Sequence, residues 1–123
     1  MIAGVYRINC DQGATFERTM TIYNPSVGGA SATPVNLTGY SARMQVRPET
    51  DSNEIMVELT TENGRLTLGG VAGTIEMEIE ADVTETFDTD GVYDLEIYNN
   101  AGKVYRVIKG RFVVEPEVTR DAE

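Results

Sequence analysis

The sequence predicts an all-β domain, namely a single antiparallel β-sandwich of about eight strands with at most one short helical turn. Apolar and polar residues alternate with period two along most of the 123 residues, which is typical of half-buried strands. Glycine and asparagine turn signals separate these runs at the roughly 8 to 12 residue spacing of small sandwiches. Only one short stretch has helical spacing.

One domain accounts for the chain, 1–123, with a core over about 2–115 and a polar C-terminal tail at 116–123. A chain of this length buries about two thirds of the surface that its unfolded form exposes, so it needs no disulfide or metal to hold a core. Residues 24–34 are rich in serine, glycine and alanine and predict one long exposed loop.

Eight segments carry the strand pattern, and in chain order they are 2–8, 15–23, 40–47, 54–60, 65–68, 74–80, 92–98 and 103–114. The clearest is the sixth, where Ile75, Met77 and Ile79 alternate with three glutamates. A strand places all three carboxylates in water, whereas helical spacing would bury some of them. Arg43 and Arg47 are expected on an adjacent strand, opposite these glutamates.

Turn residues mark the ends of several predicted strands. Asn63 and Gly64 both tolerate positive φ and predict a hairpin between the fourth and fifth strands. Gly39 and Tyr40 are expected to begin the third strand. Gly110 interrupts the long last strand and predicts a bulge or bend at which the inward face changes.

Two shorter signals complete the architecture. Residues 82–87 predict one or two helical turns, because Val83 and Phe87 stand four apart. Residues 89–95 resemble the tyrosine corner of immunoglobulin-like domains, in which the Tyr93 hydroxyl would bond backbone at the sheet corner. An ordinary inward-facing strand residue is an equally good interpretation of Tyr93.

The residue types exclude most catalytic and metal chemistry. The chain has no histidine and no tryptophan, and its one cysteine, Cys10, has no base or cation cluster beside it in the sequence. Residues 86–97 look briefly like a calcium loop, but Thr86 and Ile97 stand where the first and twelfth ligands belong. We therefore expect no enzyme, no cofactor and no metal site.

Charge is distributed unevenly along the chain. The net charge of −10 disfavours nucleic acid and membrane surfaces as partners. Residues 49–96 hold 14 acidic residues and one basic residue, whereas Lys103, Arg106, Lys109 and Arg111 form a basic cluster. This polarity suits head-to-tail contact between copies or with a neighbouring protein, and equally suits internal neutralisation across adjacent strands.

Five stretches of the chain, DQGATF at 11–16, VNLTGYSARMQVR at 35–47, LTTENG at 59–64, GVYDLE at 91–96 and GRFVVEPEVTR at 110–120, resemble small virion structural proteins of tailed bacteriophages and prophages. The likeness extends from about 11 to 120 and therefore concerns a whole domain. It implies an immunoglobulin-like β-sandwich, similar to the N-terminal docking domains of upper baseplate, tail-fibre and head-fibre proteins. The matching motifs are fold determinants and bring no functional residues with them.

The resemblance implies a non-enzymatic structural protein of the virion, made in the bacterial host cytoplasm. It would be a tail, neck or baseplate component, or a head decoration or fibre component. Its partners would be capsid, neck or tail subunits, and it would self-associate in a symmetric assembly.

Open sheet edges favour binding by strand addition, with 2–8 and 112–118 as the segments involved. The candidate interface residues are Ile2, Val5, Tyr6, Ile8, Arg106, Lys109, Arg111 and Val113. We expect deletion of 1–9, or of the tail after Glu115, to leave a folded domain that no longer enters particles.

A carbohydrate-binding or host-receptor-binding module is the alternative function. Such modules present aromatic platforms, and the phase of the strands allows outward display for Tyr23, Tyr98 and Tyr105. An enzyme would instead need two close carboxylates in a deep pocket, which no spacing in the sequence indicates.

Overall fold

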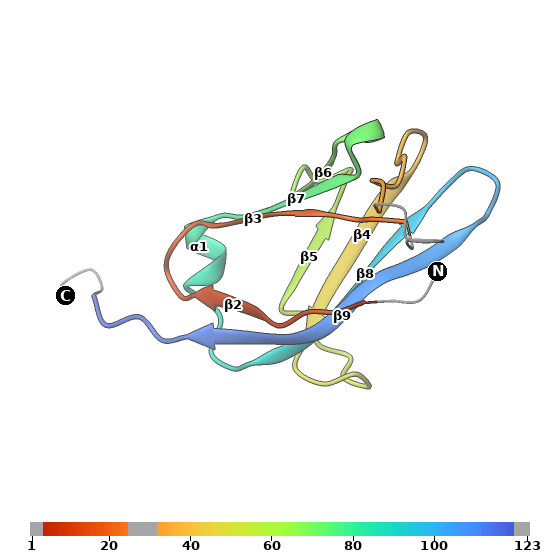
Figure 1. Ribbon diagram of the computed structural model, residues 1–123. Coiled ribbons are helices and arrows are strands. Elements are labelled where there is room, and N and C mark those ends of the chain that lie inside the picture. The colour runs from red at the N-terminus through yellow and green to blue at the C-terminus, as the bar shows by residue number, and fades with distance from the viewer. Residues whose placement is uncertain (1–3, 25–31, 120–123) are drawn as a thin grey trace.

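Two β-sheets packed face to face form the protein, as the computed structural model shows for residues 4–24 and 32–119 (Figure 1). The predicted all-β character is confirmed. The strands are β1 (Gly4–Val5), β2 (Ile8–Asp11), β3 (Phe16–Thr21), β4 (Ser41–Arg47), β5 (Val57–Thr60), β6 (Leu66–Leu68), β7 (Thr74–Ile79), β8 (Gly91–Tyr98) and β9 (Val104–Glu115). A 3₁₀ turn, η1 (Gly70–Ala72), and one short helix, α1 (Ala81–Thr84), complete the described elements.

The large sheet has the order β1-β9-β8-β4-β5, with β2 also paired to β9, and the small sheet has the order β3-β7-β6. Every pairing is antiparallel except those of β1 and β2, which run parallel to β9. The expectation of a purely antiparallel sandwich is therefore wrong at this edge. Parallel neighbours need a long connection, and here nearly the whole domain lies between β2 and β9.

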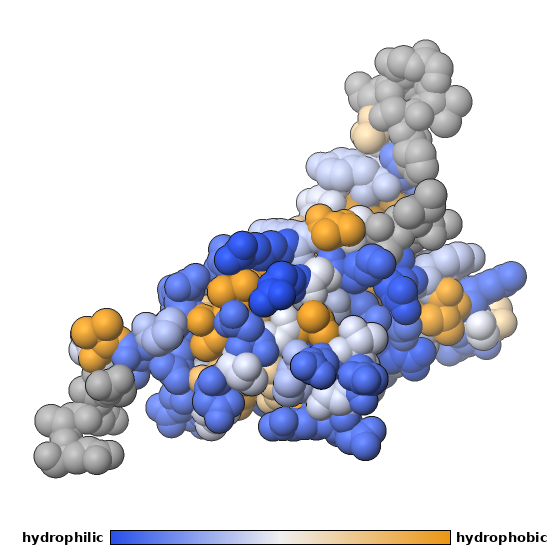
Figure 2. Space-filling view, turned by 90° about the horizontal axis from the view of Figure 1, so that it is seen from below, coloured by the Kyte–Doolittle hydropathy of each residue, from blue (hydrophilic) through white to orange (hydrophobic). Residues whose placement is uncertain are grey.

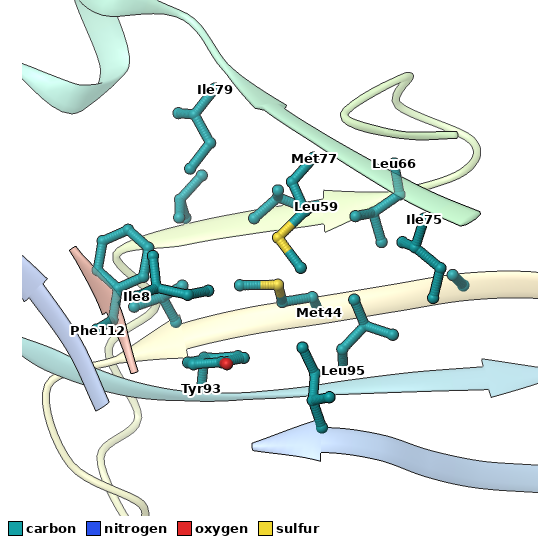
Figure 3. Packing of buried hydrophobic residues seen from close by; sticks show 14 of the residues in the cluster. Ile8, Met44, Leu59, Leu66, Ile75, Met77, Ile79, Tyr93, Leu95 and Phe112 are labelled. Carbon is teal, nitrogen blue, oxygen red and sulfur yellow. The ribbon is translucent and has the colours of Figure 1, made fainter. Parts of the chain in front are cut away.

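The core lies between the sheets, where their inward side chains interdigitate (Figure 3). Ile75, Met77 and Ile79 of β7 are buried, as the alternation with glutamate predicts. In Figure 3, Ile75 and Met77 lie on the side of Met44 and Leu95 of the large sheet, and Ile79 lies on the side of Ile8 and Phe112. Burying each such side chain contributes about 1.5–3 kcal/mol, so the pattern of alternation decides which face of every strand turns inward.

The turn at Asn63 and Gly64 is present, but it does not close a hairpin. The Asn63 carboxamide oxygen accepts the backbone N–H groups of Thr60 and Arg65, and Gly64 has a φ of 80°. However, β5 pairs with β4 in the large sheet and β6 pairs with β7 in the small one. The same turn chemistry therefore carries the chain from one sheet to the other.

The bulge in β9 lies before Gly110. Leu95 pairs with Ile108 and Glu96 pairs with Arg106, so Val107 is the extra residue. Because of this bulge, the consecutive side chains Val107 and Ile108 are both buried, and the inward face changes there. The position predicted for this change, Gly110, has a different role.

Gly110 allows the N-terminal segment to lie directly against β9. A Cβ atom at this position would overlap the backbone carbonyl of Tyr6, which lies between β1 and β2. The Tyr6 N–H donates to the Lys109 carbonyl at 2.9 Å, and the Tyr93 hydroxyl donates to the Tyr6 carbonyl at 2.5 Å. Both bonds hold the segment in register with β9.

Tyr93 is thus an inward strand residue and not a tyrosine corner. Its hydroxyl bonds a residue 87 positions earlier on a neighbouring segment, whereas the corner bonds backbone a few residues upstream. Burial raises the pKa of the Tyr93 hydroxyl well above its usual value. The side chain links the large sheet to the N-terminal segment.

The predicted helical turn occurs at α1, one residue earlier than its predicted start. Thr84 at its end is fully buried, and its hydroxyl donates to the Ala14 carbonyl while accepting the Gly13 N–H. These bonds fix the connection from β2 to β3. Within residues 4–24 and 32–119, no helix is long and apolar enough to cross a membrane.

We expect Gly110→Ala to lower the free energy of unfolding by about 1–3 kcal/mol, because the added methyl group forces Tyr6 away from β9. Urea unfolding measures this change. Gly4→Ala on β1 is the matched control, because its Cβ would meet Ile108 at an ordinary 3.8 Å. Equal losses in the two variants would contradict the role assigned to Gly110.

Alkaline pH should destabilise the fold through Cys10. Burial raises the pKa of its thiol from 9.0 to about 11, so the stability that the neutral thiol provides is complete below pH 9 and is lost as the pH rises through 11. We expect the unfolding free energy of Cys10→Ala to fall less steeply over this range than that of the parent. Parallel pH curves for the two proteins would contradict this cause.

Candidate protein-interaction surface

Basic side chains gather on the outer face of the large sheet, in a chain whose net charge is −10. The strand registers place the outward residues of β5, β4, β8 and β9 side by side on this face. Its cations are Arg43, Arg47, Arg106, Lys109 and Arg111, and its carboxylates are Glu58, Asp94, Glu96 and Glu115. These strands carry five positive charges against four negative ones, and Asp90, directly before β8, adds a further carboxylate beside Arg111.

Some of these charges neutralise one another across the strands. Arg43 pairs with Glu96 at 2.9 Å, and Arg106 pairs with Asp94 at 3.3 Å. Arg47 donates instead to neutral oxygens, the Ser52 carbonyl and the Gln45 carboxamide. Among the described residues, neither Arg47 nor Lys109 forms an ion pair. Internal neutralisation of this face is therefore incomplete.

A hollow of about 590 Å³ lies in this face. We call it the basic groove, and the cations that line it are Arg43, Arg47, Arg106 and Lys109. Val5 of β1 and Val92 of β8 also line it. Seen from the side of this sheet, the molecule is mostly hydrophilic with separate apolar residues (Figure 2). The groove thus combines unpaired positive charge with a few apolar contacts.

Three of the predicted interface residues, Val5, Arg106 and Lys109, line the basic groove. Val5 is 79% exposed and pairs in register with Lys109, which is also exposed. Arg111 is exposed and lies 3.8 Å from Asp90. Val113 is half-buried on β9, opposite Asn9. Ile2 lies outside the described residues.

Two predicted interface residues have internal roles. Ile8 is fully buried and belongs to the core, so its side chain is not available on the surface. Tyr6 is half-buried, and its hydroxyl accepts a hydrogen bond from the Arg18 guanidinium at 2.6 Å. The sequence places Ile8 at the end of one strand over 2–8, and in the structure it begins β2. Its side chain belongs to the core, so the prediction that it takes part in binding is wrong for this side chain.

The N-terminal segment already covers the edge of β9 from Ile108 to Glu115. Strand addition to β9 is therefore blocked in this conformation, and the free edge of the large sheet on this side belongs to β1 and β2. Deletion of 1–9 would remove Ile8 from the core as well, which costs about 2–5 kcal/mol for a large aliphatic side chain. That deletion does not separate folding from binding.

The first part of the C-terminal tail is also held. The Gln12 N–H donates to the Glu115 carbonyl, and the Glu117 N–H donates to the Gln12 side chain, both at 2.9 Å. The same Gln12 side chain donates to the Phe87 carbonyl at 2.7 Å. Polar contacts therefore extend the ordered structure past the core predicted to end near 115.

The outer face of the small sheet is acidic. We call the set Glu17, Glu76, Glu78 and Glu80 the acidic face; the last of these pairs with Arg65 at 3.0 Å. Hydrogen bonds from that guanidinium hold the pKa of Glu80 below its ordinary value. The other three glutamates form no ion pair within residues 4–24 and 32–119.

Arg43 and Arg47 do not lie opposite these glutamates, contrary to the sequence expectation. They belong to β4 in the large sheet, whereas β7 lies between β3 and β6 in the small one. Glu78 lies opposite another carboxylate, Glu17 of β3, on one side. On the other side its N–H donates to the carbonyl of Arg65, whose guanidinium pairs with Glu80. Like charges directly opposite each other lower the stability of the sheet. The fold does not require a carboxylate at either of these exposed positions.

The three tyrosines considered as a carbohydrate platform are dispersed. The Tyr98 ring lies under the Arg43 guanidinium at 4.8 Å, and its hydroxyl donates to Glu62. Tyr105 packs against Tyr40, with ring centroids 6.5 Å apart. Tyr23 is exposed and bridges to Pro34 outside the named strands. No two of the three are in ring contact among the described residues.

The acidic residues around the rejected calcium loop have structural contacts. Asp90 accepts the Val114 N–H at 2.8 Å and lies near Arg111, which ties the start of β8 to β9. The described part of the chain contains no group of three or more cysteine, aspartate or glutamate side chains placed to hold a metal ion.

Sequence reasoning missed Arg47 and Val92 as members of this surface. Both alternate outward on predicted strands, which is a usable signal. The sequence did not reveal the strand order, in which β8 lies between β4 and β9. In this order Arg47 pairs with Val92, and Val92 pairs with Arg111. Pairings between residues this distant along the chain are not encoded in a local pattern.

We expect Glu17→Lys to raise the free energy of unfolding by about 0.2–1 kcal/mol, because it converts the repulsion with Glu78 into an attraction and β3 has no other neighbouring strand. Urea unfolding at low and high salt checks this, and the gain should shrink at high salt. Glu76→Lys is the control, since Glu76 lies opposite the neutral residues Thr19 and Thr67. Equal gains from both substitutions would show that net charge, and not this pair, matters.

The groove, the N-terminal edge and the acidic face are the features from which we infer a function. In each of them, some charged side chains form no ion pair among the described residues, or some apolar side chains are exposed. Neither a protein-family model nor a curated protein matches this chain.

Proposed function

We propose that the protein is a non-enzymatic docking module with an immunoglobulin-like fold, which binds other proteins through the outer face of its large sheet. The observation that carries this proposal is the basic groove with the exposed Val5 at its edge. An acidic chain gains nothing in folding from concentrating unpaired cations on one face. A partner that supplies carboxylates and apolar contact accounts for them.

The strand order supports the immunoglobulin-like assignment. In that fold, strands B, E and D form the middle of one sheet, and strands G, F, C and C′ form the other. The small sheet, β3-β7-β6, matches B-E-D in sequence position, and β9-β8-β4-β5 matches G-F-C-C′. The departures are the Tyr93 bond to the N-terminal segment and the leucine at position 95, where antibody domains have a cysteine.

The chemistry of the groove favours binding over catalysis. Its carboxylates, Asp94 and Glu96, are each paired with an arginine and so serve to neutralise part of the groove's own positive charge. The only thiol, Cys10, is buried with a raised pKa and lies outside the groove lining. We therefore propose no enzymatic activity and no cofactor.

We place the module in the virion of a tailed bacteriophage or prophage, with capsid, neck or tail subunits as partners. Support comes from the sequence resemblance over about 11–120 and from a sandwich whose N-terminal edge and outer face are both open to contact. The host-receptor or carbohydrate alternative receives no specific support, because Arg43 covers the Tyr98 ring.

We expect Val5→Asp to abolish incorporation of the chain into particles without unfolding it, because it places a charge at the apolar edge of the groove. Particles purified from producing cells by density gradient are assayed for the chain. Val71→Asp on η1 is the matched control, since Val71 is 73% exposed and Val5 is 79% exposed. Equal incorporation of both variants would refute the assigned surface, and a parent chain absent from particles would refute the virion role.

A further inference from the structure

We propose that the partner in the basic groove is a second copy of this chain, which inserts the acidic face of its small sheet. This inference rests on the proposed docking function and names the occupant of that same surface. It predicts a head-to-tail contact, in which the outer face of one large sheet packs against the outer face of the next small sheet.

The unpaired charges of the two faces are complementary. The groove presents Arg47 and Lys109, which form no ion pair within the described residues, beside Arg43 and Arg106, which are paired with Glu96 and Asp94. The acidic face presents Glu17, Glu76 and Glu78, likewise without an ion pair in the described part of the chain. Contact between the faces would give each set the counter-charges that its own sheet lacks.

The like-charge pair in the small sheet supports an external cation. Glu17 and Glu78 lie directly opposite each other and repel. A lysine or arginine at either position would relieve the repulsion within the fold. A cation from another molecule, placed over both carboxylates, stabilises the same pair without any change in the chain, and Arg47 and Lys109 are cations of this kind.

The position of the two faces decides the type of assembly. They lie on opposite sides of the sandwich, because they are the outer faces of its two sheets. A contact between different surfaces of identical copies is heterologous, and it produces a ring if the rotation between neighbours closes and an open row if it does not. Both outcomes place many identical copies in one array.

Other occupants fit less well. An acidic segment of an unrelated protein would satisfy the groove but would leave the acidic face without a cation. A nucleic acid backbone would meet Asp94, Glu96 and Glu58 on the same face and a chain of net charge −10. A second copy satisfies both faces with one contact.

A charge-exchange experiment on the full chain tests this proposal. Variant A carries Arg47→Glu and Lys109→Glu, and variant B carries Glu17→Lys and Glu78→Lys. In variant B, one like-charge pair replaces another, so the stability of the small sheet should change little. Sedimentation velocity at low and high salt measures self-association, and circular dichroism verifies that each variant is folded.

We expect the parent chain to associate at low salt, and each variant alone to associate at least about tenfold more weakly, because each then presents like charges on both faces. An equimolar mixture of A and B should recover association, since the reversed groove of A meets the reversed face of B. If A or B is unfolded, Lys109→Glu mixed with Glu78→Lys repeats the test with one charge on each side.

Three results would overturn the proposal: a parent chain that stays monomeric at low salt, a mixture no more associated than its components, or a variant B that associates like the parent. The last result would indicate contact between two identical faces. Particle incorporation is scored separately. If particles contain the chain but the charge exchange does not restore association, the docking function stands and only the head-to-tail contact is refuted. If the chain associates head to tail but is absent from particles, only the virion role is refuted.

Discussion

The docking of the N-terminal segment along β9 is the constraint on which the rest of the architecture depends. Gly110 leaves room for the Tyr6 backbone, and the Tyr93 hydroxyl holds the Tyr6 carbonyl from inside the large sheet. This places Ile8 and Cys10 in the core and covers the edge of β9. Without that close approach, the core would lose one side and β9 would present an open edge to any extended chain.

The same docking builds the proposed interaction surface. It brings Val5 beside Lys109, so that an exposed apolar residue borders the cations of β4 and β9. The connection that follows β2 is held by the Thr84 hydroxyl and by the Gln12 side chain. A surface mounted on paired strands with fixed connections is preorganised, and a partner that binds it does not have to order it.

Charge is separated between the two outer faces and is neutralised within them only in part. Arg43 and Arg106 each find a carboxylate on the neighbouring strand, whereas Glu78 faces Glu17. Exposed ion pairs contribute little to stability, so selection on folding alone exerts weak control over such an arrangement. The proposed contacts between molecules would give this separation a role, because the same charges would then determine which faces meet.

Local alternation determined which residues form strands and which side chains are buried, and β4 and β7 follow it closely, because period-two burial is a property of neighbouring residues. It also determined the turn at Asn63 and Gly64. Only the tertiary structure decided that this turn joins two sheets, that β1 and β2 run parallel to β9, and that Arg47 shares a face with Lys109. Strand partners are chosen by the packing of a common core, to which residues far apart in the chain contribute, and no local pattern contains that information.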